Sequence, residues 1–195
     1  ETYLSYPADH STKRAILILT DVIGHRFINA QLIADQFAAN GYFVVMPDLF
    51  HGDPIPLNRP AGFDFKAWLT GHLPPVVDPV VDSVLNEMRA CLGCEKIGAV
   101  GYCFGAKYVV RFLKPAEKRV DVGYVAHPSF VDTEELAAIQ GPLSISAAET
   151  DAIFPPRNVM RPRIHLLRLP NLIRSIFSVV LNTASQSVQI PANQF

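Results

Sequence analysis

The sequence predicts an α/β fold, in which helices cover both faces of a mostly parallel β-sheet. Short apolar runs rich in β-branched residues alternate along the chain with segments of helical periodicity. Such alternation is typical of strand–helix–strand units, whose crossover helices pack on a parallel sheet. The 195 residues are 49% hydrophobic and 18% charged, a size and composition that suit one domain with a full hydrophobic core.

The expected strands are short, and the expected helices carry apolar stripes. Strands are predicted over residues 15–20, 42–46, 97–102, 122–126 and 143–147. Helices are predicted over 28–39, 80–91, 104–113 and 133–139, the last N-capped by Asp132. Residues 50–79 hold six prolines, which predicts a long loop with one short helix over 63–69. Loops of this length in compact domains are often functional. Phe65 and Trp68 are expected to form the apolar face of that helix, as a lid.

Ligands of open parallel sheets bind at the carboxyl ends of the strands. Five side chains directly follow predicted strands and are expected on that rim: Asp21, Asp48, Cys103, His127 and Asp151. The sequence therefore predicts its functional site there.

Charge and cysteine content restrict the class of partner. The net charge is −1, so no basic surface is expected to recruit nucleic acid, and a small-molecule ligand fits better.

Three cysteines with no disulfide framework indicate a reducing, cytoplasmic location. No apolar run is long enough to span a membrane, and a monomer or weak dimer is expected. Because the chain begins with Glu1 rather than methionine, we expect it to be truncated at the N-terminus.

The segment Gly101-Tyr102-Cys103-Phe104-Gly105 has the pattern of a nucleophile elbow. Small residues two positions before and after the nucleophile allow a strand to turn sharply into a helix without side-chain clashes. The helix N-terminus behind Cys103 favours a thiolate, the reactive form of cysteine. The alternative interpretation is an inert core thiol beside a helix start.

Five strings in this order resemble the dienelactone hydrolase family, its fungal members in particular. They are LTDVIGH (19–25), MPDLFHGDP (46–54), GYCFGAKYVVRF (101–112), VAHPSF (125–130) and AAETDAIFP (147–155). The resemblance covers residues 1–155 and implies an α/β-hydrolase domain there. It also implies carboxymethylenebutenolidase-like hydrolysis of small lactones or esters through a thioester, without a cofactor or metal.

The resemblance also implies roles for individual residues. Cys103 would be the nucleophile and Asp151 the acid of a Cys-His-Asp triad. Asp21 would be the strand-end carboxylate that helps to ionise the thiol. The backbone N–H groups of Phe104 and Val22 would form the oxyanion hole.

Other polar residues carry weaker signals, and their alternatives stay open. His127 is expected either to line the substrate pocket or to be a structural histidine whose ring nitrogens have hydrogen-bond partners. Arg59 is a candidate for binding a substrate carboxylate, and His25 for contacting substrate, although loop residues of both kinds are often only solvated. Cys91 and Cys94 form a C-x-x-C without a second Cys or His pair, a weak signal for metal or redox chemistry.

The triad histidine has no clear counterpart in the sequence. The family carries it in a Gly-X-X-His-Gly-Phe-like segment about thirty residues after the acid, whereas the only later histidine here, His165, comes too early and has no neighbouring glycine. The last 44 residues contain no Asp, Glu, Lys or Gly. We therefore treat residues 156–195 as a tail unlike the family. Two explanations are open: a frameshift in the encoding sequence, or a tail that has truly diverged.

A lost nucleotide near Pro155 would explain this tail. The codons of Leu172 to Ile190 can be read one nucleotide earlier, with a choice among the permitted synonymous codons. This reading yields the segment Gly-Val-Glu-His-Gly-Phe. Its histidine is encoded across the junction of Asn182 and Thr183. We expect the encoding DNA to contain this segment in the other frame. Genomic codons that cannot yield it would rule the hypothesis out.

Three functions follow from these observations. The first is a cysteine hydrolase of small lactones or esters, and the second is a thioesterase or general carboxylesterase on the same fold. The third is a catalytically incompetent protein that lacks the triad histidine.

Overall fold

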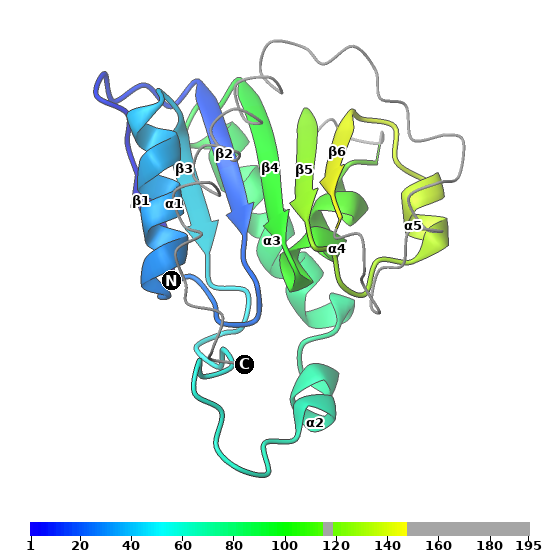
Figure 1. Ribbon diagram of the computed structural model, residues 1–195. Helices are drawn as coiled ribbons and strands as arrows, with labels where there is room; N and C mark the ends of the chain where they lie inside the picture. The colour runs from blue at the N-terminus through cyan, green and yellow to red at the C-terminus, as the bar shows by residue number, and fades with distance from the viewer. Residues whose placement is uncertain (115–118, 148–195) are drawn as a thin grey trace.

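A six-stranded β-sheet forms the centre of the computed structural model, which describes residues 1–114 and 119–147 (Figure 1). The strands are β1 (Thr2–Ser5), β2 (Arg14–Leu19), β3 (Phe43–Pro47), β4 (Lys96–Tyr102), β5 (Val122–Ala126) and β6 (Leu143–Ser146). Their order is β1-β3-β2-β4-β5-β6, with β1 antiparallel to β3 and all other pairs parallel. The predicted α/β architecture with a mostly parallel sheet is therefore confirmed.

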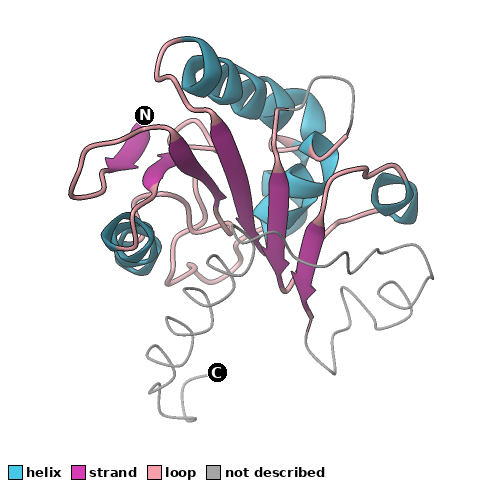
Figure 2. Ribbon diagram, turned by 90° about the horizontal axis from the view of Figure 1, so that it is seen from above, coloured by secondary structure: helices cyan, strands magenta, loops and turns pink. Residues whose placement is uncertain are grey.

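Helices cover both faces of this sheet. Helix α1 (Ile28–Ala39) lies on one face, and α3 (Pro74–Ala90) and α4 (Phe104–Phe112) lie on the other (Figure 2). The short helix α2 (Phe65–Thr70) lies beyond the carboxyl ends of the parallel strands, and α5 (Thr133–Ala137) precedes β6 (Figure 1). Among the described residues, no helix has both the length and the apolar character needed to cross a membrane.

The alternation of side chains along β2 divides the core into two layers. Leu17 and Leu19 pack with the apolar residues of α3 and α4, whereas Ile16 and Ile18 pack with those of α1. All four are at most 1% exposed, because a parallel strand covered on both faces has no solvent side. This explains the continuous apolar run that predicted the strand.

Two elements differ most from the prediction, and most of the others differ by one or two residues at an end. The edge strand β1 was not expected, because its four residues alternate between exposed and half-buried and carry no strong apolar signal. Helix α3 begins at Pro74 rather than at residue 80. Prolines in the first turn of a helix remove no intrahelical hydrogen bond, and the buried Val77 extends the apolar stripe of Val81 and Leu85 by one turn.

Asp121 joins three segments at the amino ends of β4 and β5. Its carboxylate accepts hydrogen bonds from the backbone N–H of Ile97 at 2.8 Å, from Arg89 at 2.7 Å and from Lys96 at 3.1 Å. Burial raises the pKa of this carboxyl, but the three donors outweigh burial and hold the pKa below its usual value. The charged form of Asp121 therefore stabilises the fold.

We predict that Asp121→Asn lowers the free energy of unfolding at pH 7 by about 1–2 kcal/mol, because the charge-assisted hydrogen bonds are lost. A depressed folded-state pKa contributes stability above the unfolded value of about 3.9, and this contribution disappears as pH falls through the folded pKa. Denaturant unfolding between pH 3 and 8 should thus show the two proteins converging in acid. The exposed Glu134→Gln is the control, and a deficit independent of pH would contradict the assignment.

Candidate active site

Cys103 lies at the sharp turn between β4 and α4, with φ of 51° and ψ of −110°. A positive φ is rare for a residue with a side chain, and such strain persists only where surrounding structure enforces it. Its backbone N–H donates to the Ala126 carbonyl at 3.1 Å, which ties the turn to the end of β5. The geometry is that of a nucleophile elbow.

The two elbow glycines allow backbone segments to approach closely. A Cβ atom on Gly105 would lie 2.0 Å from the Leu19 carbonyl oxygen, and one on Gly101 would lie 2.7 Å from Ala106 Cα. The Gly105 N–H also donates to the Thr20 carbonyl at 3.0 Å. Any side chain at Gly105 would therefore push α4 away from β2, and with it the loop that follows β2.

That close approach places the loop after β2 beside the first turn of α4. Phe104 occupies the first helical position, where a backbone N–H has no intrahelical acceptor. Within the described part of the chain, neither this N–H nor that of Val22 has a hydrogen-bond acceptor. The Val22 carbonyl is held at 2.8 Å by the N–H of Ile55. Unpaired N–H groups of this kind can stabilise an oxyanion.

Ser129, which the sequence analysis did not single out, is the hydrogen-bond partner of the Cys103 thiol. Its Oγ lies 3.3 Å from Cys103 Sγ, and the residue is 4% exposed. Its backbone N–H donates to the Cys103 carbonyl at 3.0 Å. The only sequence signal was its place in VAHPSF, two residues after the rim residue His127.

The predicted rim residues follow the strands as expected, but their contacts differ. Asp21 accepts a hydrogen bond from the Ile23 N–H at 2.8 Å, and no hydrogen bond among the described residues joins it to Cys103. His127 is exposed and has φ of 38°. Asp151 and His165 lie outside the described residues. The roles of Asp21, His127 and Asp151 therefore stay predictions.

His25 is buried in the loop after β2, with 4% exposure. Its Nδ1 lies 3.7 Å from Asp48 Oδ1, and its Nε2 lies 3.7 Å from Glu1 Oε1. No hydrogen bond to Nε2 is found within the described residues. The surroundings are those of a buried histidine between two carboxylates at the edge of the sheet.

An aromatic cluster packs helix α2 against the elbow. Trp68 packs against Phe50 and Phe104 at ring-centroid distances of 5.3 and 6.1 Å, and it stacks on His72 at 4.2 Å. Its Nε1 donates to the Asp53 carbonyl at 2.8 Å. Because Phe104 directly follows Cys103, helix α2 is packed against the turn that carries the thiol.

Phe65 extends this aromatic cluster toward the loop after β5. Its ring stacks with that of Phe130 at 6.4 Å, and the guanidinium of Arg59 lies 5.9 Å from its centroid. Phe130 is 38% exposed and follows Ser129. A half-buried and an exposed aromatic ring, with an arginine beside them, thus connect α2 to the loop that carries Ser129.

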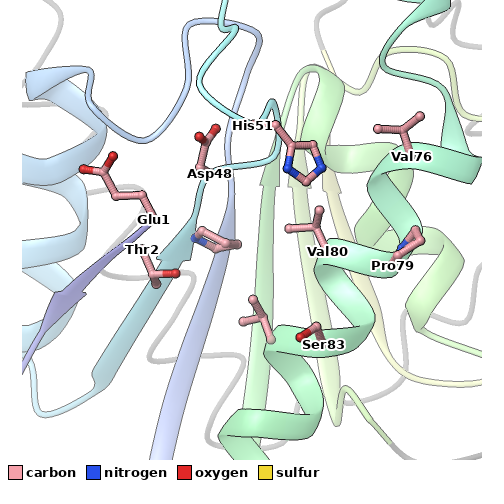
Figure 3. Close-up of a pocket in the computed structure, with 10 residues that line it drawn as sticks. Glu1, Thr2, Asp48, His51, Val76, Pro79, Val80 and Ser83 are labelled. Atoms are coloured by element: carbon pink, nitrogen blue, oxygen red, sulfur yellow. The ribbon is translucent and has the colours of Figure 1, made fainter.

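A separate pocket of about 370 Å³ lies between the start of β1, the end of β3 and α3 (Figure 3). Asp48 and His51 line it at the strand ends, and Val80 and Ser83 line it on α3. Cys103, Ser129 and Phe104 do not contribute to it. The Cys103 thiol and its hydrogen-bond partner therefore lie outside this pocket.

The C-x-x-C cysteines do not have the surroundings of a reactive or metal-binding pair. A hydrogen bond with Glu87 raises the pKa of the Cys91 thiol, and burial raises the pKa of Cys94. Neither cysteine is disulfide-bonded. No cluster of three or more His, Cys, Asp or Glu side chains suited to a metal ion occurs in residues 1–114 and 119–147.

A solved structure of low sequence identity shares the fold of this chain. An esterase from an Arctic intertidal metagenomic library superimposes with a TM-score of 0.61 at 16% identity, covering 80% of this chain and 70% of that one. This likeness supports the α/β-hydrolase fold that the sequence predicted.

Relatives with higher identity narrow the assignment. Hydrolase tropI of Talaromyces stipitatus is 60% identical over 163 residues, 80% of this chain and 63% of the relative. Dienlactone hydrolase 1 of Gibberella moniliformis is 33% identical over 84% of this chain and 64% of its own length. The chain thus spans just under two thirds of the length of these relatives. The model of the dienelactone hydrolase family matches residues 1–166. The chain belongs to the dienelactone hydrolase family.

Proposed function

We propose that the protein hydrolyses small lactones or esters, with Cys103 as the nucleophile. The observation that carries this proposal is the strained turn at Cys103, which is followed by an N–H group without an acceptor. Strain of this kind is typical of functional positions, and an elbow presents its side chain to solvent at the rim of the sheet. The name Dienlactone hydrolase 1 of a relative supports a lactone as substrate.

The reaction would run in two steps. The Cys103 thiolate attacks the carbonyl carbon, the C–O bond of the ester breaks, and the leaving alkoxide takes up the proton that the thiol lost. Water then adds to the thioester, which releases the acid and returns the proton to sulfur. The N–H groups of Phe104 and Val22 would stabilise the oxyanion in both steps.

Both steps need a group that carries the proton. We propose Asp151 as the residue that orients a histidine, with that histidine encoded in the other reading frame of the tail. No histidine bonds Cys103 within the described residues. A chain that lacks this histidine would still bind substrate and alkylating reagents but would turn over slowly, since triad members act as a unit. This is the incompetent alternative.

We predict that Cys103→Ala lowers the hydrolysis rate of a small lactone or a p-nitrophenyl ester by about 10³-fold or more. Mass spectrometry after rapid acid quenching should detect the acyl group on the Cys103 peptide of the unsubstituted protein. Cys91→Ala is the matched control and should keep both properties, because Cys91 is exposed at the end of α3, and the whole of β4 separates it from the elbow.

Full turnover by Cys103→Ala would refute the cysteine mechanism. Acylation of Cys103 without turnover would instead favour the incompetent protein. Preference for a thioester over lactones and oxygen esters would favour the thioesterase alternative.

We also propose that Arg59 binds a carboxylate on the substrate. Arg59 is exposed in the loop before α2, and its guanidinium lies over Phe65 in the aromatic cluster. Stacking on a ring restricts the guanidinium and leaves its N–H groups available for bidentate binding. The substrate would then combine a planar or apolar part with an anionic group.

We expect Arg59→Ala to raise KM for a carboxylate-bearing lactone by about tenfold or more, the loss of one charge-assisted contact. The KM for a neutral ester should change little, because no charge is lost there. Lys66→Ala, which removes an exposed positive charge from α2, is the control. An equal rise in KM for both substrates would contradict a role in carboxylate binding.

A further inference from the structure

We propose that Ser129 is a positioning residue that donates a hydrogen bond to Cys103 Sγ and favours the reactive thiolate. The inference rests on the proposed function of Cys103. It adds a residue from the loop after β5, outside the elbow and outside the predicted triad.

The direction of the hydrogen bond follows from burial. Ser129 is 4% exposed, and Cys103 Sγ at 3.3 Å is the one partner of its Oγ among the described residues. A buried hydroxyl proton without an acceptor is unfavourable. We therefore infer that the sulfur is the acceptor and Ser129 the donor.

Backbone contacts hold Ser129 in this position. Its N–H donates to the carbonyl of Cys103 at 3.0 Å, while the N–H of Cys103 donates to Ala126 at 3.1 Å. Lys107 Nζ donates to the Phe130 carbonyl at 2.7 Å, which fixes the next residue of the loop. The hydroxyl is thus carried by a loop that is bonded to the nucleophile on one side and to α4 on the other.

The hydroxyl has a preference between the two states of the sulfur. A hydrogen bond to a charged acceptor is roughly twice as strong as one to a neutral acceptor, so a fixed donor favours the thiolate over the thiol. The thioester sulfur carries no charge. The effect therefore belongs to the free enzyme and to acylation, rather than to deacylation.

Other ionisable groups lie on the segments around Cys103. They are Tyr102 on β4, Asp21 after β2, His127 after β5 and Lys107 on α4. The Lys107 ammonium is bonded to Asp132 and Glu135, each at 2.9 Å, as well as to the Phe130 carbonyl. Variants at Ser129 leave all these charges unchanged, so a difference between their pH profiles reports on the hydroxyl.

The test measures the rate at which iodoacetamide alkylates Cys103 in the full chain between pH 5 and 10, read from the Cys103 peptide by mass spectrometry. For Ser129→Ala the profile should move to higher pH by about one unit, which makes alkylation at pH 7 about tenfold slower. Ser129→Thr keeps the hydroxyl and should retain the original profile. In turnover assays, Ser129→Ala should lower kcat/KM and leave the deacylation rate unchanged.

Ser146→Ala is the matched control, since it removes a hydroxyl that accepts from Tyr124 at the end of the neighbouring strand. Ser129→Gly replaces Ser129→Ala if the latter does not fold. An unchanged profile, a profile moved to lower pH, or an equal movement in Ser146→Ala would overturn the proposal. If Cys103→Ala is inactive but Ser129→Ala has an unchanged alkylation profile, only the role of Ser129 is refuted. Full activity of Cys103→Ala would instead refute the proposed function.

Discussion

The close approach of Gly105 to the end of β2 is the constraint on which the rest of the site depends. With no room for a Cβ beside the Leu19 carbonyl, α4 starts directly against the sheet, and Cys103 must adopt a positive φ to connect β4 to it. The Gly105 N–H also donates to the Thr20 carbonyl at 3.0 Å, which ties the start of α4 to the residue after β2. The turn thus sets the position of the thiol.

A network of charged side chains holds the surrounding helices in register. Lys107 and Arg111 extend from successive turns of α4 and both bond Glu135 on α5, and Arg111 also bonds Asp78 on α3. Glu135 is only 8% exposed, and its charge is compensated by these two cationic side chains together with a hydrogen bond from the Asp132 backbone N–H. Because Lys107 also bonds the loop that carries Ser129, the network connects the helix layer to the proposed thiol partner.

Much of the fold could be predicted, because its signals are local. Residues 28–39 and 122–126 form the predicted elements with identical bounds, since an apolar stripe or a β-branched run specifies them without long-range contacts. Helix α3 was predicted to begin six residues too late, because its early prolines are compatible with a first turn only when Val77 has a core to enter. Strand β1 depends wholly on pairing with β3, and its own sequence carries too little apolar character.

Glycine spacing and strand ends are properties of neighbouring residues, so the elbow, the family and the rim on which Cys103, Asp21 and His127 lie could be predicted from the sequence. Which groups meet there depends on the three-dimensional arrangement of the chain. It brought Ser129 to the thiol across 26 residues, directed Asp21 to its own loop and enclosed His25 between Glu1 and Asp48. Partners of this kind are decided by how parallel strands align and how loops turn, and no periodicity in the chain encodes the direction of a side chain at a strand end.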